Sequence, residues 1–73
     1  MTKDEAEREA LRRWRKLPIR DRQEFDQAVG FADTIEQELD FRTMANPRKL
    51  IAAWLIRDIV RTRDMASELK QAS

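Results

Sequence analysis

Apolar residues recur at helical spacing in three separate segments of the chain. In the first segment they fall four residues apart at Ala6, Ala10 and Trp14, and Leu17 continues the same face. Two later segments show spacings of three and four, which suit a helix and not a strand. The pattern therefore predicts an all-α fold class with helices over about 3–16, 19–42 and 47–70.

Capping residues and prolines set the expected helix boundaries. Thr2 followed by Glu5 is a capping-box pattern, and Pro18 ends the first helix because proline disfavours helical geometry in the residue before it. The second helix starts between Pro18 and Asp21. Asn46-Pro47 combines a cap with a first-turn proline. We expect one domain over residues 1–73: a three-helix bundle in which a short helix leads into a long antiparallel hairpin.

The apolar positions of the second and third segments define their expected inner faces. Gly30 lies away from the second face and costs about 1 kcal/mol of helix propensity without an evident reason. The expected inner positions are Phe25, Ala28, Val29, Ala32, Ile35 and Leu39 in the second segment, and Ile51, Ala52, Leu55, Ile56, Ile59, Ala66 and Leu69 in the third.

The third segment carries more apolar surface than one small bundle needs. Below roughly 70 to 80 residues a lone core rarely supplies more than about 3 to 5 kcal/mol. Leu50 and Trp54 lie roughly opposite Ile59, and a helix that is apolar nearly all round is normally buried on several sides. We therefore expect a homodimer through this helix, or a contact with another protein, at Leu50, Trp54, Arg57 and Arg61. The alternative is that Leu50 and Trp54 pack under the first helix or the 41–46 loop.

Charge is strongly segregated along the chain although the net charge is only +1. Residues 8–22 and 42–63 are basic, whereas residues 24–40 hold six acids and no base. Arg8, Arg12 and Arg15 share the outer side of the first helix, where guanidinium groups could bind phosphates. Nucleic-acid binding through these residues is the second hypothesis, because the acidic segment repels phosphate.

Candidate catalytic and metal-binding residues are few. The sequence has no Cys and no His, which removes disulfides, the usual zinc sites and thiol or imidazole chemistry. Asp33, Glu36 and Asp40 share helical spacing that could face a divalent cation, but a solvated or ion-paired face is the simpler interpretation. Ser67 and Ser73 have no His to activate them. We expect a non-enzyme without cofactor or metal.

Hydropathy and function complete the expectation. No apolar run reaches 18 residues, the N-terminus lacks an apolar signal segment, and the first helix has a thin apolar face, so we expect a cytoplasmic protein without membrane contact. The sequence favours a small helical regulator or adaptor that docks on a partner protein. The alternative is a small nucleic-acid-binding regulator that uses the basic face of the first helix.

Overall fold

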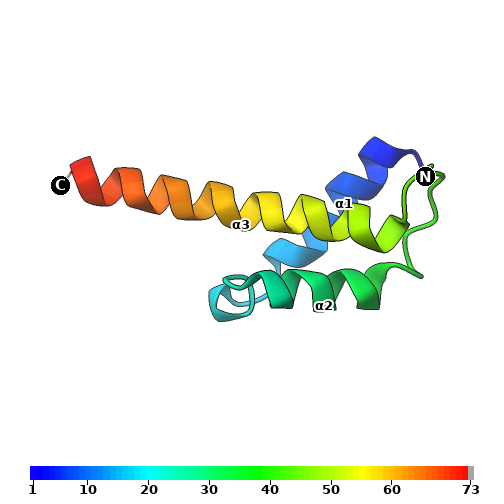
Figure 1. The fold of residues 1–73 in the computed structure, drawn as a ribbon, viewed down its shortest axis with the longest axis horizontal. Coiled ribbons are helices and arrows are strands. Elements are labelled where there is room, and N and C mark those ends of the chain that lie inside the picture. The colour runs from blue at the N-terminus through cyan, green and yellow to red at the C-terminus, as the bar shows by residue number, and fades with distance from the viewer. Residues whose placement is uncertain (73) are drawn as a thin grey trace.

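Three α-helices make up the fold. The computed structural model describes the backbone of residues 1–72 and the side chains of residues 1–65. It contains α1 (Lys3–Arg15), α2 (Phe25–Ile35) and α3 (Pro47–Ala72), with a short 3₁₀ turn, η1 (Ile19–Asp21), and no strand among the described residues. Helix α2 runs antiparallel beside α3, and α1 crosses α3 (Figure 1). The predicted all-α class is confirmed.

A capping residue, terminal charges and a proline set the two ends of helix α1. The Thr2 hydroxyl accepts a hydrogen bond from the Glu5 amide at 3.2 Å, which satisfies a free N–H of the first turn. Acids in the first turn and arginines in the last turn stabilise the helix, because each lies at the end where the helix dipole has the opposite sign. The helix ends just before Leu17-Pro18, where the Leu17 amide donates to the Trp14 carbonyl.

Helix α2 starts later than its predicted first residue, 19. The Gln27 side-chain oxygen accepts hydrogen bonds from the amides of Gln23 and Glu24, at 3.0 and 2.9 Å, and so caps a helix that begins at Phe25. The Gln27 side-chain nitrogen also donates to the Arg20 carbonyl. Residues 19–21 are left as a single 3₁₀ turn, and Glu24 with Gln27 replaces the expected cap at Asp21.

Helix α2 also ends earlier than the predicted residue 42. Asp33, Glu36 and Glu38 crowd its C-terminal end, where the helix dipole is negative, and no base lies in its last turn. The chain leaves the helix, and Leu39 and Phe41 enter the core from non-helical backbone. The predicted long hairpin is therefore wrong in its length, because α2 has 11 residues and α3 has 26.

Helix α3 starts at the predicted cap and extends beyond the bundle. The Asn46 side-chain oxygen accepts from the amides of Arg48 and Lys49, at 3.0 and 3.4 Å. The molecule measures 44 × 20 × 19 Å, and its long dimension follows α3 (Figure 1). Within the described residues no helix combines the length and the apolar character that crossing a membrane requires.

All three helices contribute to one core. Trp14 is fully buried, with its ring centroid 5.5 Å from that of Phe31, and buried alanines on α1 and α2 allow both helices to approach α3 closely. Phe25 and Val29 differ from expectation, because they are 45% and 48% exposed. No neighbouring atom requires glycine at position 30. The side chains of Ala66, Ser67, Leu69 and Ser73 lie outside the described residues. Among residues 1–65 the buried ones are Ala6, Ala10, Trp14, Ala28, Ala32, Ile35, Leu39, Phe41, Ile51, Ala52, Trp54, Leu55 and Ile59.

Candidate functional site

Cations from α1 and α3 meet on one side of the molecule. One open hollow follows α1, and a second lies between α1 and α3. Leu11 and Arg15 line both hollows, so the two form one continuous surface. We call this surface the α1/α3 basic face; its cations are Arg8, Arg12, Arg15, Lys16, Arg57 and Arg61.

The basic face joins residues that the sequence placed in two separate hypotheses. Arg8, Arg12 and Arg15 were expected to contact nucleic acid, and Arg57 and Arg61 were expected to contact a protein. The structure brings the two groups to adjoining hollows that share Leu11 and Arg15, and all five arginines are exposed.

Trp54 and Leu50 are held within the fold. Trp54 is 5% exposed, and its ring centroid lies 5.7 Å from that of Phe41. Leu50 is partly buried against the core. We expected Trp54 to be exposed as the main contact with a partner, and this is corrected. Phe41, in the segment after α2, packs against the tryptophan and covers it. The alternative, in which the two residues pack inside the chain's own fold, describes the geometry.

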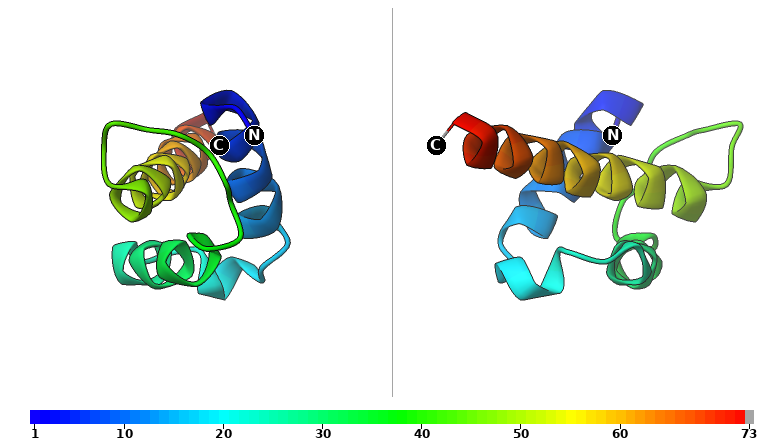
Figure 2. Two further views of the ribbon diagram at one scale, coloured as in Figure 1. Left: turned by 90° about the vertical axis from the view of Figure 1, so that its right-hand side faces the viewer. Right: turned by 60° about the vertical axis from the view of Figure 1, so that its left-hand side comes forward.

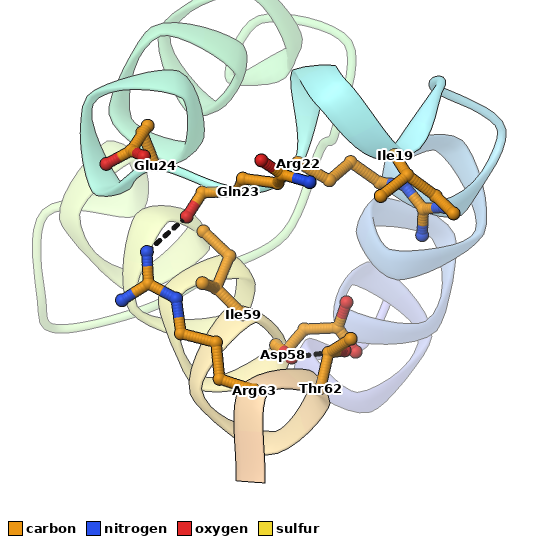
Figure 3. Close-up of a pocket in the computed structure, with 8 residues that line it drawn as sticks. All are labelled: Ile19, Arg22, Gln23, Glu24, Asp58, Ile59, Thr62 and Arg63. Carbon is orange, nitrogen blue, oxygen red and sulfur yellow. Dashed lines mark hydrogen bonds between the residues drawn. The ribbon is translucent and has the colours of Figure 1, made fainter. Parts of the chain in front are cut away.

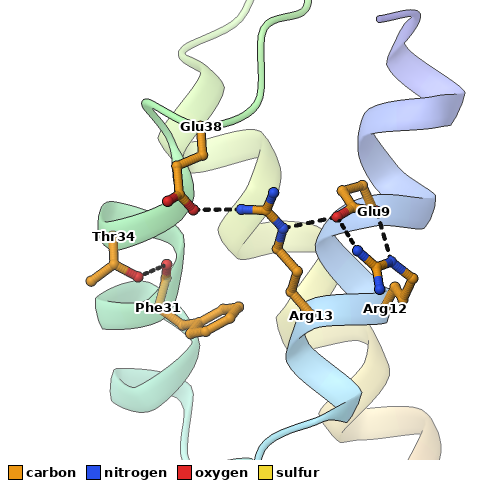
Figure 4. A network of polar contacts seen from close by, with 6 residues as sticks. All are labelled: Glu9, Arg12, Arg13, Phe31, Thr34 and Glu38. Carbon is orange, nitrogen blue, oxygen red and sulfur yellow. Dashed lines mark hydrogen bonds and ion pairs between the residues drawn. The ribbon is translucent and has the colours of Figure 1, made fainter.

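Ion pairs around Glu9 lie at the edge of the basic face and join α1 to the segment after α2 (Figure 4). Glu9 accepts from Arg12 at 2.6 and 2.8 Å and from Arg13 at 2.9 Å. Arg13 also pairs with Glu38, which ties α1 to the segment after α2. Arg15 reaches Asp58 on α3 at 3.2 Å. In the structure these contacts orient the guanidinium groups of Arg12 and Arg15 towards Glu9 and Asp58.

The arginines around Glu9 change its acidity. Hydrogen bonds from Arg12, followed by those from Arg13, lower the pKa of Glu9 from 4.5 to about 2. The same contacts raise the pKa of both arginines. Glu9 therefore stays ionised in the folded protein at pH values where the unfolded chain binds a proton.

This shift predicts a pH-dependent stability contribution. Because the pKa of Glu9 is lower in the folded state, its contribution is complete above about pH 4.5 and is lost as the pH falls towards 2. We expect Glu9→Gln to lower the melting temperature at pH 7 and to match the parent near pH 2. Thermal melts of both proteins across this range check it; a difference that persists unchanged at pH 2 contradicts it.

The basic face is positive but not uniformly so. Glu7, Glu9 and Asp58 lie among its six cations, which leaves a net charge of +3. Sequence reasoning missed Leu11 and Asp58 as members of this surface. Asp58 gave a usable signal, because it is the one acid between Leu50 and Arg63 and so stands out as a partner for an arginine of another helix.

A separate groove lies between η1 and α3 (Figure 3). Ile19 and Arg22 line one side, and Ile59 and Thr62 line the other. Arg63 donates to the Gln23 carbonyl across this groove, and the Thr62 hydroxyl donates to the Asp58 carbonyl at 2.9 Å. Arg63 and Thr62 thus make contacts within the chain, whereas the Nε atom of Arg22 is buried without a hydrogen-bond partner among the described residues.

The acidic residues of the α2 region are not gathered into one cluster in the described part of the chain. Among the described residues no three Asp or Glu side chains come close enough to hold a metal ion. Asp33 instead pairs with Arg48 at 3.3 Å. Asp40 lies beyond the end of α2, so the helical spacing that linked it with Asp33 and Glu36 does not apply.

Comparison with known proteins gives no further assignment. No protein family matches the chain, and no characterised protein and no solved structure is detectably similar to it. The function is therefore argued from the geometry of the basic face.

Proposed function

We propose that this protein is a non-catalytic interaction module, a small helical regulator or adaptor that docks on an acidic surface of a partner protein. The observation that carries the proposal is the meeting of cations from α1 and α3 on one continuous face. Leu11 adds an apolar contact between the two groups. Arginine is enriched at protein-binding hot spots, because its planar group pairs with carboxylates and also packs well.

The ion pairs across this face favour a partner that is a protein. Arg12 and Arg15 are already positioned by Glu9 and Asp58, so binding costs less side-chain entropy at these residues. A partner's carboxylates can share these arginines, and a partner's own base can pair with Glu7. Arginines held in this way present fixed donors to an acidic helix or loop.

A small nucleic-acid-binding regulator remains the second candidate. The gathering of six cations on one face favours it, since phosphate contacts supply most non-specific affinity. The three carboxylates within the same face oppose it, because they repel the phosphate backbone. The two candidates differ in their response to salt and nuclease.

We also propose that the module works as a homodimer. A chain of 73 residues has a small core, and burial between two copies supplements it. A dimer would also present two basic faces to one partner, which raises the overall affinity without any new kind of contact.

Affinity capture from host cells tests the docking proposal. We expect the tagged protein to retain a protein partner after nuclease treatment, and the double variant Arg57→Glu, Arg61→Glu to lose it. The matched control is Arg20→Glu with Arg42→Glu, which makes the same charge change at exposed positions outside the basic face. This control should capture as the parent does.

The opposite pattern supports the second candidate. If nucleic acid is the sole partner and its affinity falls steeply with salt, the docking proposal is wrong. Changing Arg8, Arg12 and Arg15 together would then weaken nucleic-acid binding and also flatten its salt dependence, because fewer counterions are released when fewer phosphates are contacted.

A further inference from the structure

Helices α2 and α3 each carry apolar side chains that the core does not fully bury. Phe25 and Val29 lie one turn apart on α2, and they are 45% and 48% exposed. Ile56 and Val60 lie one turn apart on α3; Val60 is 42% exposed and Ile56 is partly buried. We call these four residues the α2/α3 seam.

Contacts near both ends of α2 define its axial register against α3, that is, which residues of the two helices lie side by side. Asp33 of α2 pairs with Arg48 of α3 at 3.3 Å. Near the other end, the guanidinium carbon of Arg63 lies 5.4 Å from the centre of the Phe25 ring. Between these contacts the helical repeat places Val29 level with Ile56, and Phe25 level with Val60.

The seam faces away from the rest of the bundle. Viewed along the helices, α1 lies on one side of the α2 and α3 pair, and no described helix covers the opposite side (Figure 2, left). Ala28, Ala32 and Ile35 of α2 are buried in the core, whereas Phe25 and Val29 are half-exposed, and Phe25 lies beneath the Arg63 guanidinium of α3. Apolar side chains grouped in this way typically mark an interface.

The two edges of the seam carry opposite charges. Helix α2 contributes Asp26 and Asp33 with Glu36 just after its end, and residues 24–40 contain no base. The first turn of α3 contributes Arg48 and Lys49. The surface is thus acidic along one helix and basic along the other, so it is complementary to a rotated copy of itself.

We propose that the α2/α3 seam is the interface of a homodimer in which α2 of each copy packs on α3 of the other. This inference rests on the self-association in the proposed function and names its surface and geometry. Packing α2 of each copy on α3 of the other requires a twofold axis parallel to the two helices. Every helix then packs antiparallel to its neighbours, and the four apolar residues of each copy meet those of the other.

The charges of the two helices favour a twofold axis parallel to the helices over one perpendicular to them. A twofold axis perpendicular to the helices would place α2 on α2 and α3 on α3. Like charges would then face each other, and their repulsion would weaken the dimer. The parallel axis instead keeps each residue at its own level along the bundle. Asp33 of one copy therefore lies level with Lys49 of the partner copy, where opposite charges attract.

Sedimentation velocity on the full chain tests the dimer. We expect a mass twice the chain mass of 8.7 kDa at micromolar concentration. Val29→Glu should give a monomer whose circular dichroism remains helical, because Val29 is 48% exposed in the single chain. The matched control Met44→Glu changes a residue that is fully exposed outside the seam, and it should leave the dimer intact.

A charge exchange tests the symmetry. Asp33→Lys and Lys49→Glu should each raise the dimer dissociation constant about tenfold or more, and the double variant should restore it. A monomeric parent at high micromolar concentration would overturn the inference, as would a dimer that Val29→Glu leaves unchanged or a charge exchange that restores nothing. A monomer that still captures its partner overturns the seam alone, whereas a dimer that captures nothing overturns the docking proposal alone.

Discussion

Replacing Trp14 with alanine is expected to lower the free energy of unfolding by about 3 to 5 kcal/mol. Trp14 is completely buried where α1 meets the other helices, and its ring packs 5.5 Å from the Phe31 ring. Alanine would leave a cavity that the neighbouring alanines of α1 cannot fill. The loss rivals the whole stability that a core of this size supplies.

Urea denaturation followed by circular dichroism measures this loss, at several protein concentrations so that dimerisation is separated from folding. Trp14→Phe is the matched control. It keeps most of the ring contact and removes the indole N–H, which is buried without an acceptor among the described residues. The phenylalanine variant should therefore lose much less stability than the alanine variant. If Trp14→Ala unfolds at the parent's urea concentration, Trp14 is exposed and the nucleic-acid hypothesis gains support.

Replacing Trp54 with alanine should also destabilise the isolated protein by about 3 to 5 kcal/mol. Trp54 is 5% exposed, and it packs against Phe41 beneath the groove that Leu11 and Arg15 line. Removing the ring takes away the support of both α1 and the segment after α2. The effect should appear in denaturation without any partner present.

Arg57→Ala is the control for Trp54, because it changes an exposed residue one turn away and should alter stability by no more than about 0.5 kcal/mol. A Trp54→Ala protein that unfolds like the parent but fails to capture its partner would contradict the core position. That result would restore the sequence interpretation of Trp54 as an exposed anchor.

Local chemistry in the sequence was sufficient for the ends of α1 and the start of α3. Thr2 and Asn46 accept the hydrogen bonds that their positions predict. The buried face of α1 also follows from spacing, because Ala6, Ala10 and Trp14 contact the core at regular turns. In these segments the apolar period, the caps and the charges all favour the same structure.

Helix α2 shows where such reasoning fails. Leu39 follows Ile35 at helical spacing, so the period alone extends the helix past its true end. The acids near Glu36 oppose that extension through the helix dipole, and the two signals cannot be weighed without knowing where Phe41 packs. Phe25 and Val29 were assigned to the core for the same reason, since spacing identifies an apolar face but not its neighbour.

The candidate site depends on contacts between distant residues. Arg15 and Asp58 are 43 positions apart, and only the crossing of α1 and α3 brings them together. The sequence identified most arginines of the basic face but divided them between two partners. Tertiary packing decides that they line two adjoining hollows and that the largely buried Trp54 forms part of the second.

The central claim is that the cations of α1 and α3 bind one protein partner as a single surface. It is tested most directly by quantitative capture of the same nuclease-resistant partner with three proteins: Arg8, Arg12 and Arg15 changed to glutamine, Arg57 and Arg61 changed to glutamate, and all five changed together. A single surface predicts that either set alone reduces capture of the same partner at least tenfold and that the combined protein reduces it at least as far. Full capture by the α1 variant, with loss only in the α3 variant, would contradict the claim.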